Sequence, residues 1–105
     1  MPTFEDREKE FETRFKHDQE LRFKVTARRN RLLGLWAAEK MGLSGEAADA
    51  YAKTVVDAEF AGGDKHVVEK IVADLAAKGQ PVTPPQVQFE LDHFAETAKQ
   101  QLMSE

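Results

Sequence analysis

Apolar residues recur every three or four positions along most of this 105-residue chain. That spacing is typical of α-helices that bury one face, and no alternating apolar run is long enough to predict a β-strand. Three stripes stand out: Val87, Leu91, Phe94, Ala95, Ala98 and Leu102; Val67, Val68, Ile71, Val72 and Leu75; and Tyr51, Val55, Val56 and Phe60. The pattern predicts an all-α protein in which these stripes are core faces.

Helix start and stop signals divide the pattern into segments. Thr3 and Thr83 are predicted N-caps, each with a partner for a capping box three residues later. The first two predicted segments are Phe4–Lys24 and Gln19–Met41, the second of which ends at Gly42. A third is capped by Ser44, runs to Ala61 and stops at Gly62-Gly63, and a fourth is capped by Asp64 and closed by Gly79. The last runs from Thr83 to Met103. Short loops favour antiparallel neighbours. We therefore expect a four-helix bundle domain, residues 19–105, after a flexible or marginally helical N-terminal segment, residues 1–18.

The first stretch has little core to support a helix, but its charges are ordered. An acidic residue precedes a basic one by four positions in five pairs: Glu5–Lys9, Glu10–Arg14, Glu12–Lys16, Asp18–Arg22 and Glu20–Lys24. Each such pair stabilises a helix by roughly 0.2–0.5 kcal/mol. These pairs predict a helix that depends on local charge rather than on burial.

Three phenylalanines form the only apolar strip of this N-terminal segment. On one helical wheel through the first forty residues, Phe4, Phe11 and Phe15 fall within about 40° of one another. The main stripe of the next segment, which lies about 80° away, consists of Leu21, Val25, Leu32, Leu35 and Trp36. Two interpretations follow. The rings cover the bundle's own surface, or they anchor an amphipathic helix in a groove of another protein, where aromatic and arginine side chains often dominate binding.

The predicted segment Gln19–Met41 carries a second apolar strip on the side opposite its main stripe. This strip consists of Phe23, Ala27, Gly34, Ala38 and Met41. A helix that is apolar on two faces is expected to have neighbours on both sides. The small residues in the strip would allow one of those neighbours to approach closely. We therefore expect this segment to be the central helix of the bundle.

Charge is distributed unevenly along the chain. The formal net charge is −4, yet residues 1–31 hold nine of the 15 basic residues, including every arginine, and seven of the 19 acidic ones. Cysteine is absent, which excludes disulfides and thiolate chemistry. No apolar stretch reaches the roughly 18 residues of a membrane span, and the charged start is unlike a secretory signal. We expect a cytoplasmic protein without direct membrane insertion.

Few residues in the chain suggest catalysis or a cofactor. The three histidines, His17, His66 and His93, lie on different segments, and none is beside a candidate nucleophile. The sequence Glu90-x-x-His93 has the spacing found in di-iron bundles, which need two such motifs, and it occurs once. We predict neither an enzyme nor a cofactor or metal site.

The stretch Arg22–Arg31 contains five basic residues and no acidic one, which is one feature of nucleic-acid binding. A nucleic-acid or general regulatory binding protein is therefore the alternative function. On the wheel, however, these residues lie on both sides of the apolar stripe, whereas phosphate tracking favours a single basic stripe on a protein that is not acidic. The other interpretation is that they flank a buried stripe and pair with the acidic bundle.

Several strings of residues resemble one known family. They are Phe23-Lys24, the run Ala27-Arg28-Arg29-Asn30-Arg31-Leu32-Leu33-Gly34-Leu35-Trp36-Ala37-Ala38, the run Ala50-Tyr51-Ala52-Lys53-Thr54-Val55-Val56, and the opening Phe4-Glu5-Asp6-Arg7-Glu8. They resemble the zeta-subunit family of alphaproteobacterial ATP synthases, small proteins that inhibit ATP hydrolysis by the rotary enzyme. The resemblance extends along nearly the whole chain and is strongest from Phe4 to Phe60.

This resemblance implies a four-helix bundle with a mobile N-terminal inhibitory segment, which inserts between subunits of the catalytic head near the rotor. The matching residues are Phe4, Asp6, Arg7, Glu8 and Phe15, whereas Phe11 is assigned from the wheel alone. Arg14 is assigned as a partner for carboxylates, as is Arg7. The expected partners are the alpha, beta and gamma subunits of the head, with no nucleic acid. The free protein is expected to be a monomer, in the cytoplasm and peripherally associated with the membrane-bound synthase.

Overall fold

The computed structural model describes residues 3–105, which contain helices and no strand. In chain order the helices are α1 (Phe4–His17), α2 (Gln19–Lys40), α3 (Gly45–Ala77) and α4 (Pro84–Met103). The prediction of an all-α, four-helix fold is confirmed. The N-terminal segment, expected to be flexible or marginally helical, forms a capped helix.

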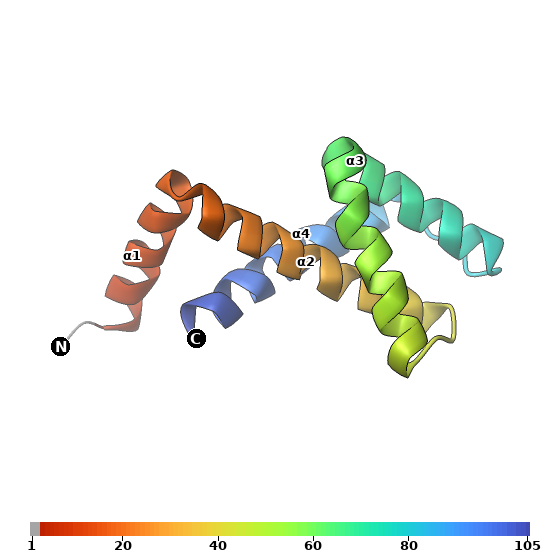
Figure 1. The fold of residues 1–105 in the computed structure, drawn as a ribbon, viewed down its shortest axis with the longest axis horizontal. Coiled ribbons are helices and arrows are strands. Elements are labelled where there is room, and N and C mark those ends of the chain that lie inside the picture. The colour runs from red at the N-terminus through yellow and green to blue at the C-terminus, as the bar shows by residue number, and fades with distance from the viewer. Residues whose placement is uncertain (1–2) are drawn as a thin grey trace.

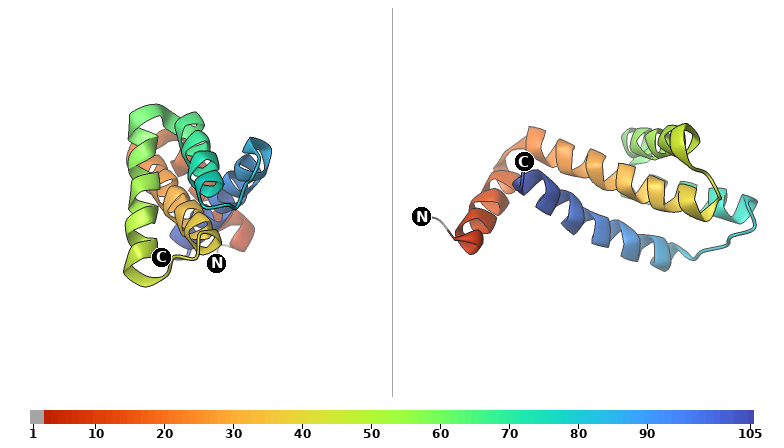
Figure 2. Two further views of the ribbon diagram at one scale, coloured as in Figure 1. Left: turned by 90° about the vertical axis from the view of Figure 1, so that its right-hand side faces the viewer. Right: turned by 90° about the horizontal axis from the view of Figure 1, so that it is seen from below.

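The helices form an elongated molecule of 51 × 26 × 23 Å. Figure 1 shows α2 as the central helix, crossed by the first half of α3. In Figure 2, right, α4 runs beside α2 in the opposite direction, and α1 lies at the far end, near the C-terminus. The expected two-sided contact of the central helix is confirmed, because α2 packs against both α3 and α4.

Small residues allow α2 and α3 to approach each other closely. A Cβ atom added to Gly34 would lie 2.7 Å from the Cα of Ala52, closer than side chains tolerate. Ala37 and Ala38 are fully buried on the same helix. The close approach predicted from the small residues of this segment is therefore confirmed.

The main core lies among α2, α3 and α4. Its fully buried large side chains are Leu33, Val55, Val67, Ile71, Leu75 and Val87, with Leu91 nearly so. These residues belong to the stripes predicted from helical periodicity, apart from Leu33. Phe60, which we expected on the same core face as Val55, is instead 66% exposed.

The break predicted at Gly62-Gly63 is a sharp kink inside α3. Gly63 has φ 74° and ψ −166°, a left-handed conformation that side chains with a Cβ rarely adopt. Asp64 does not cap the second half of the helix as predicted, because its carboxylate accepts hydrogen bonds from Arg29. Ser44 occupies the predicted N-cap position but makes no side-chain capping bond.

A second break separates α1 from α2, where we had predicted one continuous stretch to Lys24. Asp18 has an extended backbone, with φ −107° and ψ 105°, and its carboxylate accepts a hydrogen bond from the Leu21 N–H at 3.2 Å. Asp18 caps α2 in this way, and among residues 3–105 it forms no ion pair with Arg22, contrary to the expected Asp18–Arg22 pair. The break coincides with the predicted boundary after residue 18, and the different roles of the two parts remain a prediction.

Candidate functional site

The start of α1 is fixed by its own first turn. The Asp6 N–H donates to the Thr3 hydroxyl, and the Thr3 N–H donates to the Asp6 carboxylate, both at 3.2 Å. This is the capping box predicted from the sequence. Glu5 and Asp6 near the N-terminus and Arg14 and Lys16 in the last turn also complement the helix dipole. These local signals favour a helix here and fix where it begins.

The three phenylalanines of α1 occupy different environments. Phe11 is 6% exposed and packs with Leu21, Val25 and Ala98 in a small second core. Phe15 is half-buried beside that cluster, whereas Phe4 is 60% exposed. Of the two interpretations of the strip, Phe11 therefore fits the one in which the rings cover the bundle's own surface, and Phe4 does not.

Lys99 of α4 makes the polar contact that joins α1 to the bundle. Its Nζ lies 3.7 Å from the Glu12 Oε1 and 4.6 Å from the centroid of the Phe15 ring. It also lies 3.8 Å from the Glu96 Oε1 on its own helix. Among residues 3–105, no other ion pair connects α1 to the rest of the molecule. Sequence reasoning missed Lys99, which is 87 positions from Glu12.

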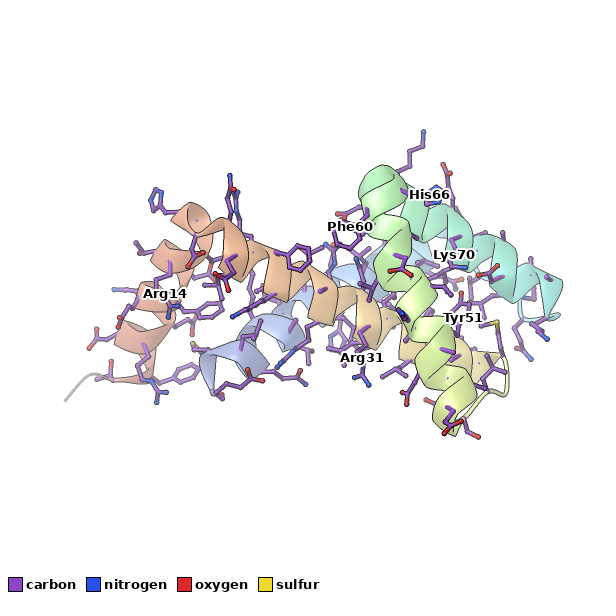
Figure 3. The ribbon with its side chains drawn as sticks, in the orientation of Figure 1. Arg14, Arg31, Tyr51, Phe60, His66 and Lys70 are labelled. Carbon is purple, nitrogen blue, oxygen red and sulfur yellow. The ribbon has the colours of Figure 1, made fainter. Side chains whose placement is uncertain are left out.

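The remaining candidate residues of α1 face solvent. Phe4, Arg7, Glu8 and Arg14 are all exposed, and in residues 3–105 the charged three make no ion pair. Figure 3 shows Arg14 on α1, at the end of the molecule remote from Tyr51 and Lys70. All seven predicted site residues thus lie on α1: these four are exposed, Asp6 is in the cap, and Phe11 and the half-buried Phe15 face the bundle.

The predicted ladder of charge pairs along the first stretch is wrong for most of its members. Of the five pairs, Glu20–Lys24 lies within ion-pair distance, at 3.5 Å, and it belongs to α2. Glu12 is directed to Lys99 instead of Lys16, and Asp18 to the cap of α2. The helix is therefore held by its cap and by Phe11 more than by pairs along its surface.

Arg28, Arg29 and Arg31 form ion pairs with acidic residues of the bundle. This agrees with the interpretation that the basic stretch pairs with the acidic bundle. Arg29 donates to the Asp64 Oδ1 at 2.7 Å and to the Glu59 Oε1 at 3.3 Å. Two other ion pairs, Arg28–Glu105 at 2.6 Å and Arg31–Asp49 at 3.5 Å, link α2 to the C-terminus and to α3. These contacts occupy guanidinium groups that a nucleic-acid interface would use.

The Arg29 network shifts the ionisation of its two acids in opposite directions. Burial, followed by the contact with Asp64, raises the pKa of Glu59, although Arg29 acts against this rise. Burial alone would raise the pKa of Asp64 too, but its interactions with Glu59 and Arg29 outweigh burial and lower the pKa. As the pH falls, Asp64 therefore keeps its negative charge opposite Arg29 to a lower pH than Glu59 does.

A second polar network joins the two halves of α3. The Tyr51 hydroxyl donates to the Asp74 Oδ2 at 2.8 Å, and the Lys70 Nζ lies 2.8 Å from the same oxygen. Burial, then the bond to Asp74, raises the pKa of Tyr51. Among residues 3–105, no group of three or more His, Cys, Asp or Glu side chains could hold a metal ion. The Arg29 network links α2 to α3, and the Tyr51 network links the two halves of α3.

The family of the chain follows from a comparison of its sequence with known families. The family described as ATPase inhibitor subunit zeta matches residues 1–101. The chain belongs to this family. A search of curated proteins returned no match. Membership confirms the resemblance given above and supports the role of a regulatory subunit that inhibits, and associates with, ATP synthase. In the part of the chain that the structure describes, no helix is long and apolar enough to cross a membrane.

Proposed function

We propose that the protein blocks ATP hydrolysis by ATP synthase by inserting its N-terminal helix at a catalytic subunit interface. The partners would be the alpha, beta and gamma subunits of the catalytic head, to which the protein binds peripherally, from the cytoplasm. The observation that carries the proposal is the way α1 is attached. It is a preformed helix with an exposed face, joined to the bundle by one buried ring and one lysine.

The contacts that hold α1 on the bundle are weak compared with the free energy of a tight protein complex. Burying one phenylalanine side chain stabilises by about 1.5–3 kcal/mol. An exposed ion pair contributes about 0–1 kcal/mol, and a cation–π contact at the surface about 0.5–1 kcal/mol. A nanomolar complex with a partner corresponds to roughly 12 kcal/mol. Binding of that strength readily offsets the loss of the contacts that Phe11, Phe15 and Lys99 make.

Each residue of the helix then has a role in the complex. Phe4, Phe11 and Phe15 enter an apolar groove of the partner, for which Phe11 must first leave its cluster with Leu21, Val25 and Ala98. Arg7 and Arg14 pair with carboxylates of the partner. Asp6 or Glu8 pairs with its basic groups. The inserted helix acts as a wedge against the opening and closing of a catalytic site, while the acidic bundle stays outside.

Removal of the N-terminal segment tests which part of the chain inhibits. We expect full-length protein to inhibit ATP hydrolysis by the synthase of the same organism, and a variant lacking residues 2–18 to lose that inhibition. The melting temperature of the variant should show that α2, α3 and α4 still fold together. Equal inhibition by both proteins would assign the activity to the bundle.

A pair of exposed phenylalanines provides a finer test. Phe4 is 60% exposed on α1 and Phe89 is 69% exposed on α4. Phe4→Ala should weaken inhibition about tenfold or more, as expected for an aromatic anchor, and should leave the melting temperature nearly unchanged. Phe89→Ala is the matched control, because it removes the same surface from the other end of the molecule. Similar effects of the two substitutions would contradict the assignment.

A further inference from the structure

Two exposed aromatic rings lie together where α3 crosses α2. Phe23 of α2 is 53% exposed and Phe60 of α3 is 66% exposed, and their ring centroids are 5.5 Å apart. Figure 3 shows Phe60 on the side of α3 that crosses α2. Phe60 lies three residues before the kink at Gly63, beyond which α3 changes direction. Adjacent exposed rings of this kind are typical of surfaces that bind another molecule.

The two rings flank an apolar cavity between α2 and the first half of α3. Its volume is about 280 Å³, and Ala27 and Val56 form part of its wall. No residue of α1 lines it. Phe11 docks α1 on Leu21 and Val25, which lie outside the cavity. The cavity is therefore open to a partner while α1 still lies on the bundle.

The polar link between α2 and α3 holds the two walls of this cavity in place. Arg29 of α2 donates to the Glu59 Oε1 at 3.3 Å and to the Asp64 Oδ1 at 2.7 Å. Glu59 directly precedes Phe60, and Asp64 directly follows the kink. These contacts thus tie the part of α3 that carries Phe60 to α2. A surface that has its binding shape before the partner arrives loses less conformational entropy on binding.

The unpaired charge at this cavity is positive. Arg22 lines the cavity, is exposed, and forms no ion pair among residues 3–105. The acidic residue of the lining, Glu59, has a side chain that is 21% exposed and already pairs with Arg29. Charge complementarity therefore favours a partner that presents an apolar side chain next to a carboxylate. A cationic group in the same place would be repelled by Arg22.

We propose that Phe23, Phe60 and Arg22 form a docking surface for ATP synthase that is separate from α1. An apolar side chain of the synthase packs against the two rings, and a neighbouring carboxylate pairs with Arg22. This inference rests on the proposed function. Arg22 is four residues after Asp18, where α1 ends, or about 6 Å along α2. Docking here holds α1 close to the synthase, so the capture of α1 becomes an intramolecular step with a high effective concentration.

Full-length Phe60→Ala tests the two rings. Its Kd for the purified synthase is measured by surface plasmon resonance, and its inhibition of ATP hydrolysis is measured separately. We expect the Kd and the concentration for half-inhibition to rise about fivefold or more. Inhibition at saturation should equal that of wild type, because α1 is intact. A wild-type Kd would overturn the proposal, and so would weaker inhibition at saturation with an unchanged Kd, which would place Phe60 in the inhibitory step.

Phe89→Ala is the matched control for Phe60→Ala. Phe89 is 69% exposed but lies outside this cavity, on α4. The Kd of Phe89→Ala should equal that of wild type, and unchanged melting temperatures would show that both variants fold. A loss of affinity of the same size in both variants would indicate non-specific contact with exposed rings and contradict the docking surface.

A second pair of variants tests the charge. Arg22→Glu should raise the Kd about fivefold, and more at low salt than at high salt, because the new carboxylate repels the one on the synthase. Arg22→Lys should bind nearly as wild type does. Lys78→Glu is the control, since Lys78 is exposed at the end of α3 and forms no ion pair among residues 3–105. Equal losses in Arg22→Glu and Lys78→Glu would mean that net charge alone sets the affinity, and would contradict a carboxylate partner of Arg22.

Two further outcomes separate this proposal from its rivals. If the wild-type chain binds the synthase without inhibiting it, the inhibitory role of α1 is wrong, and the Kd of Phe60→Ala still decides the docking surface. Sedimentation equilibrium tests whether a second copy of the chain is the occupant. A wild-type dimer that Phe60→Ala converts to a monomer, with no change in affinity for the synthase, would assign the surface to self-association and overturn the proposal.

Discussion

The two hydrophobic cores of the molecule differ in size and in how many helices they join. The main core joins α2, α3 and α4 through ten buried residues, most of them large aliphatic side chains. The small core at the α1 end has four buried residues, and α1 supplies one of them, Phe11. Since the burial of apolar surface is the main driving force of folding, we expect α1 to detach at a smaller cost than any of the other three helices. The proposed mechanism requires this difference, because it needs a stable bundle and a helix that can leave it.

The largest effect is expected in the main core. Leu75 is fully buried there, so Leu75→Ala should lower the free energy of unfolding by about 2–5 kcal/mol. Thermal and urea unfolding followed by circular dichroism measure this loss, with Phe89→Ala as a surface control that should change stability by at most about 0.5 kcal/mol. A loss no larger than that of the control would mean that the core does not dominate stability.

Phe11→Ala should produce a smaller and local effect. The substitution removes about 1.5–3 kcal/mol of burial from the contact between α1 and the bundle. We expect fast hydrogen exchange of the amides in residues 4–17, while amides around Ile71 and Leu75 keep their protection. A global loss of protection as large as that of Leu75→Ala would show that α1 is an integral part of the fold.

A separate comparison concerns Glu59 and Asp64, the two acidic residues of the polar link between α2 and the kink of α3. Glu59 has a raised pKa, so its protonated form is favoured on folding. Its contribution to stability is complete below its ordinary pKa and is lost as pH rises through the raised value. Asp64 has a lowered pKa, so its contribution is present above its ordinary pKa and is lost as pH falls through the lowered value.

These signs predict opposite results for two similar substitutions. At pH 7, Asp64→Asn should destabilise by about 1 kcal/mol, because it leaves Arg29 without its nearest carboxylate but that carboxylate is half exposed to solvent. Glu59→Gln should be neutral or stabilising at pH 7 and should flatten the decline in stability above about pH 4.5. Urea unfolding between pH 3 and 8 measures both, with the exposed Asp57→Asn as control. Equal losses for the two variants would contradict this assignment.

The features that depend on short spacings could be predicted from the sequence. The stripes of Val67, Ile71, Leu75, Val87 and Leu91 are buried, and the Thr3 and Thr83 capping boxes are present. Phe60 was predicted wrongly because periodicity identifies a face of the helix but not how far the neighbouring helix extends along it. Phe60 lies three residues before the kink at Gly63, where Phe23 is its aromatic neighbour.

The candidate site was less predictable, for a geometric reason. The wheel that separated Phe4, Phe11 and Phe15 from the main stripe assumes one straight helix, and Asp18 breaks that helix. Because of the break, sequence spacing no longer relates the direction of a side chain on α1 to that of one on α2. Phe11 can therefore point into a cluster with Leu21 and Val25. The contact with Lys99 has no local signal, because only the tertiary fold brings α4 beside α1.

The smallest expected effect concerns the contact between Lys99 and α1, and it connects the docking of α1 with inhibition. Lys99→Met keeps the length of the side chain but removes the charge that interacts with Glu12 and with the Phe15 ring. Together these contacts are worth about 1 kcal/mol, so the undocked form of α1 should become about fivefold more populated. If α1 must leave the bundle before it binds, inhibition of ATP synthase should tighten by up to the same factor.

Lys40→Met is the matched control for Lys99→Met. Lys40 lies 5.1 Å from the centroid of the Trp36 ring, so it makes the same kind of contact, far from α1. Hydrogen exchange of residues 4–17 and the concentration for half-inhibition should change in Lys99→Met and remain as in wild type in Lys40→Met. Faster exchange combined with weaker inhibition would mean that the docked helix, held by Lys99, is the form that the synthase recognises. The contact between α1 and α4 would then be part of the inhibitory surface rather than a restraint on it.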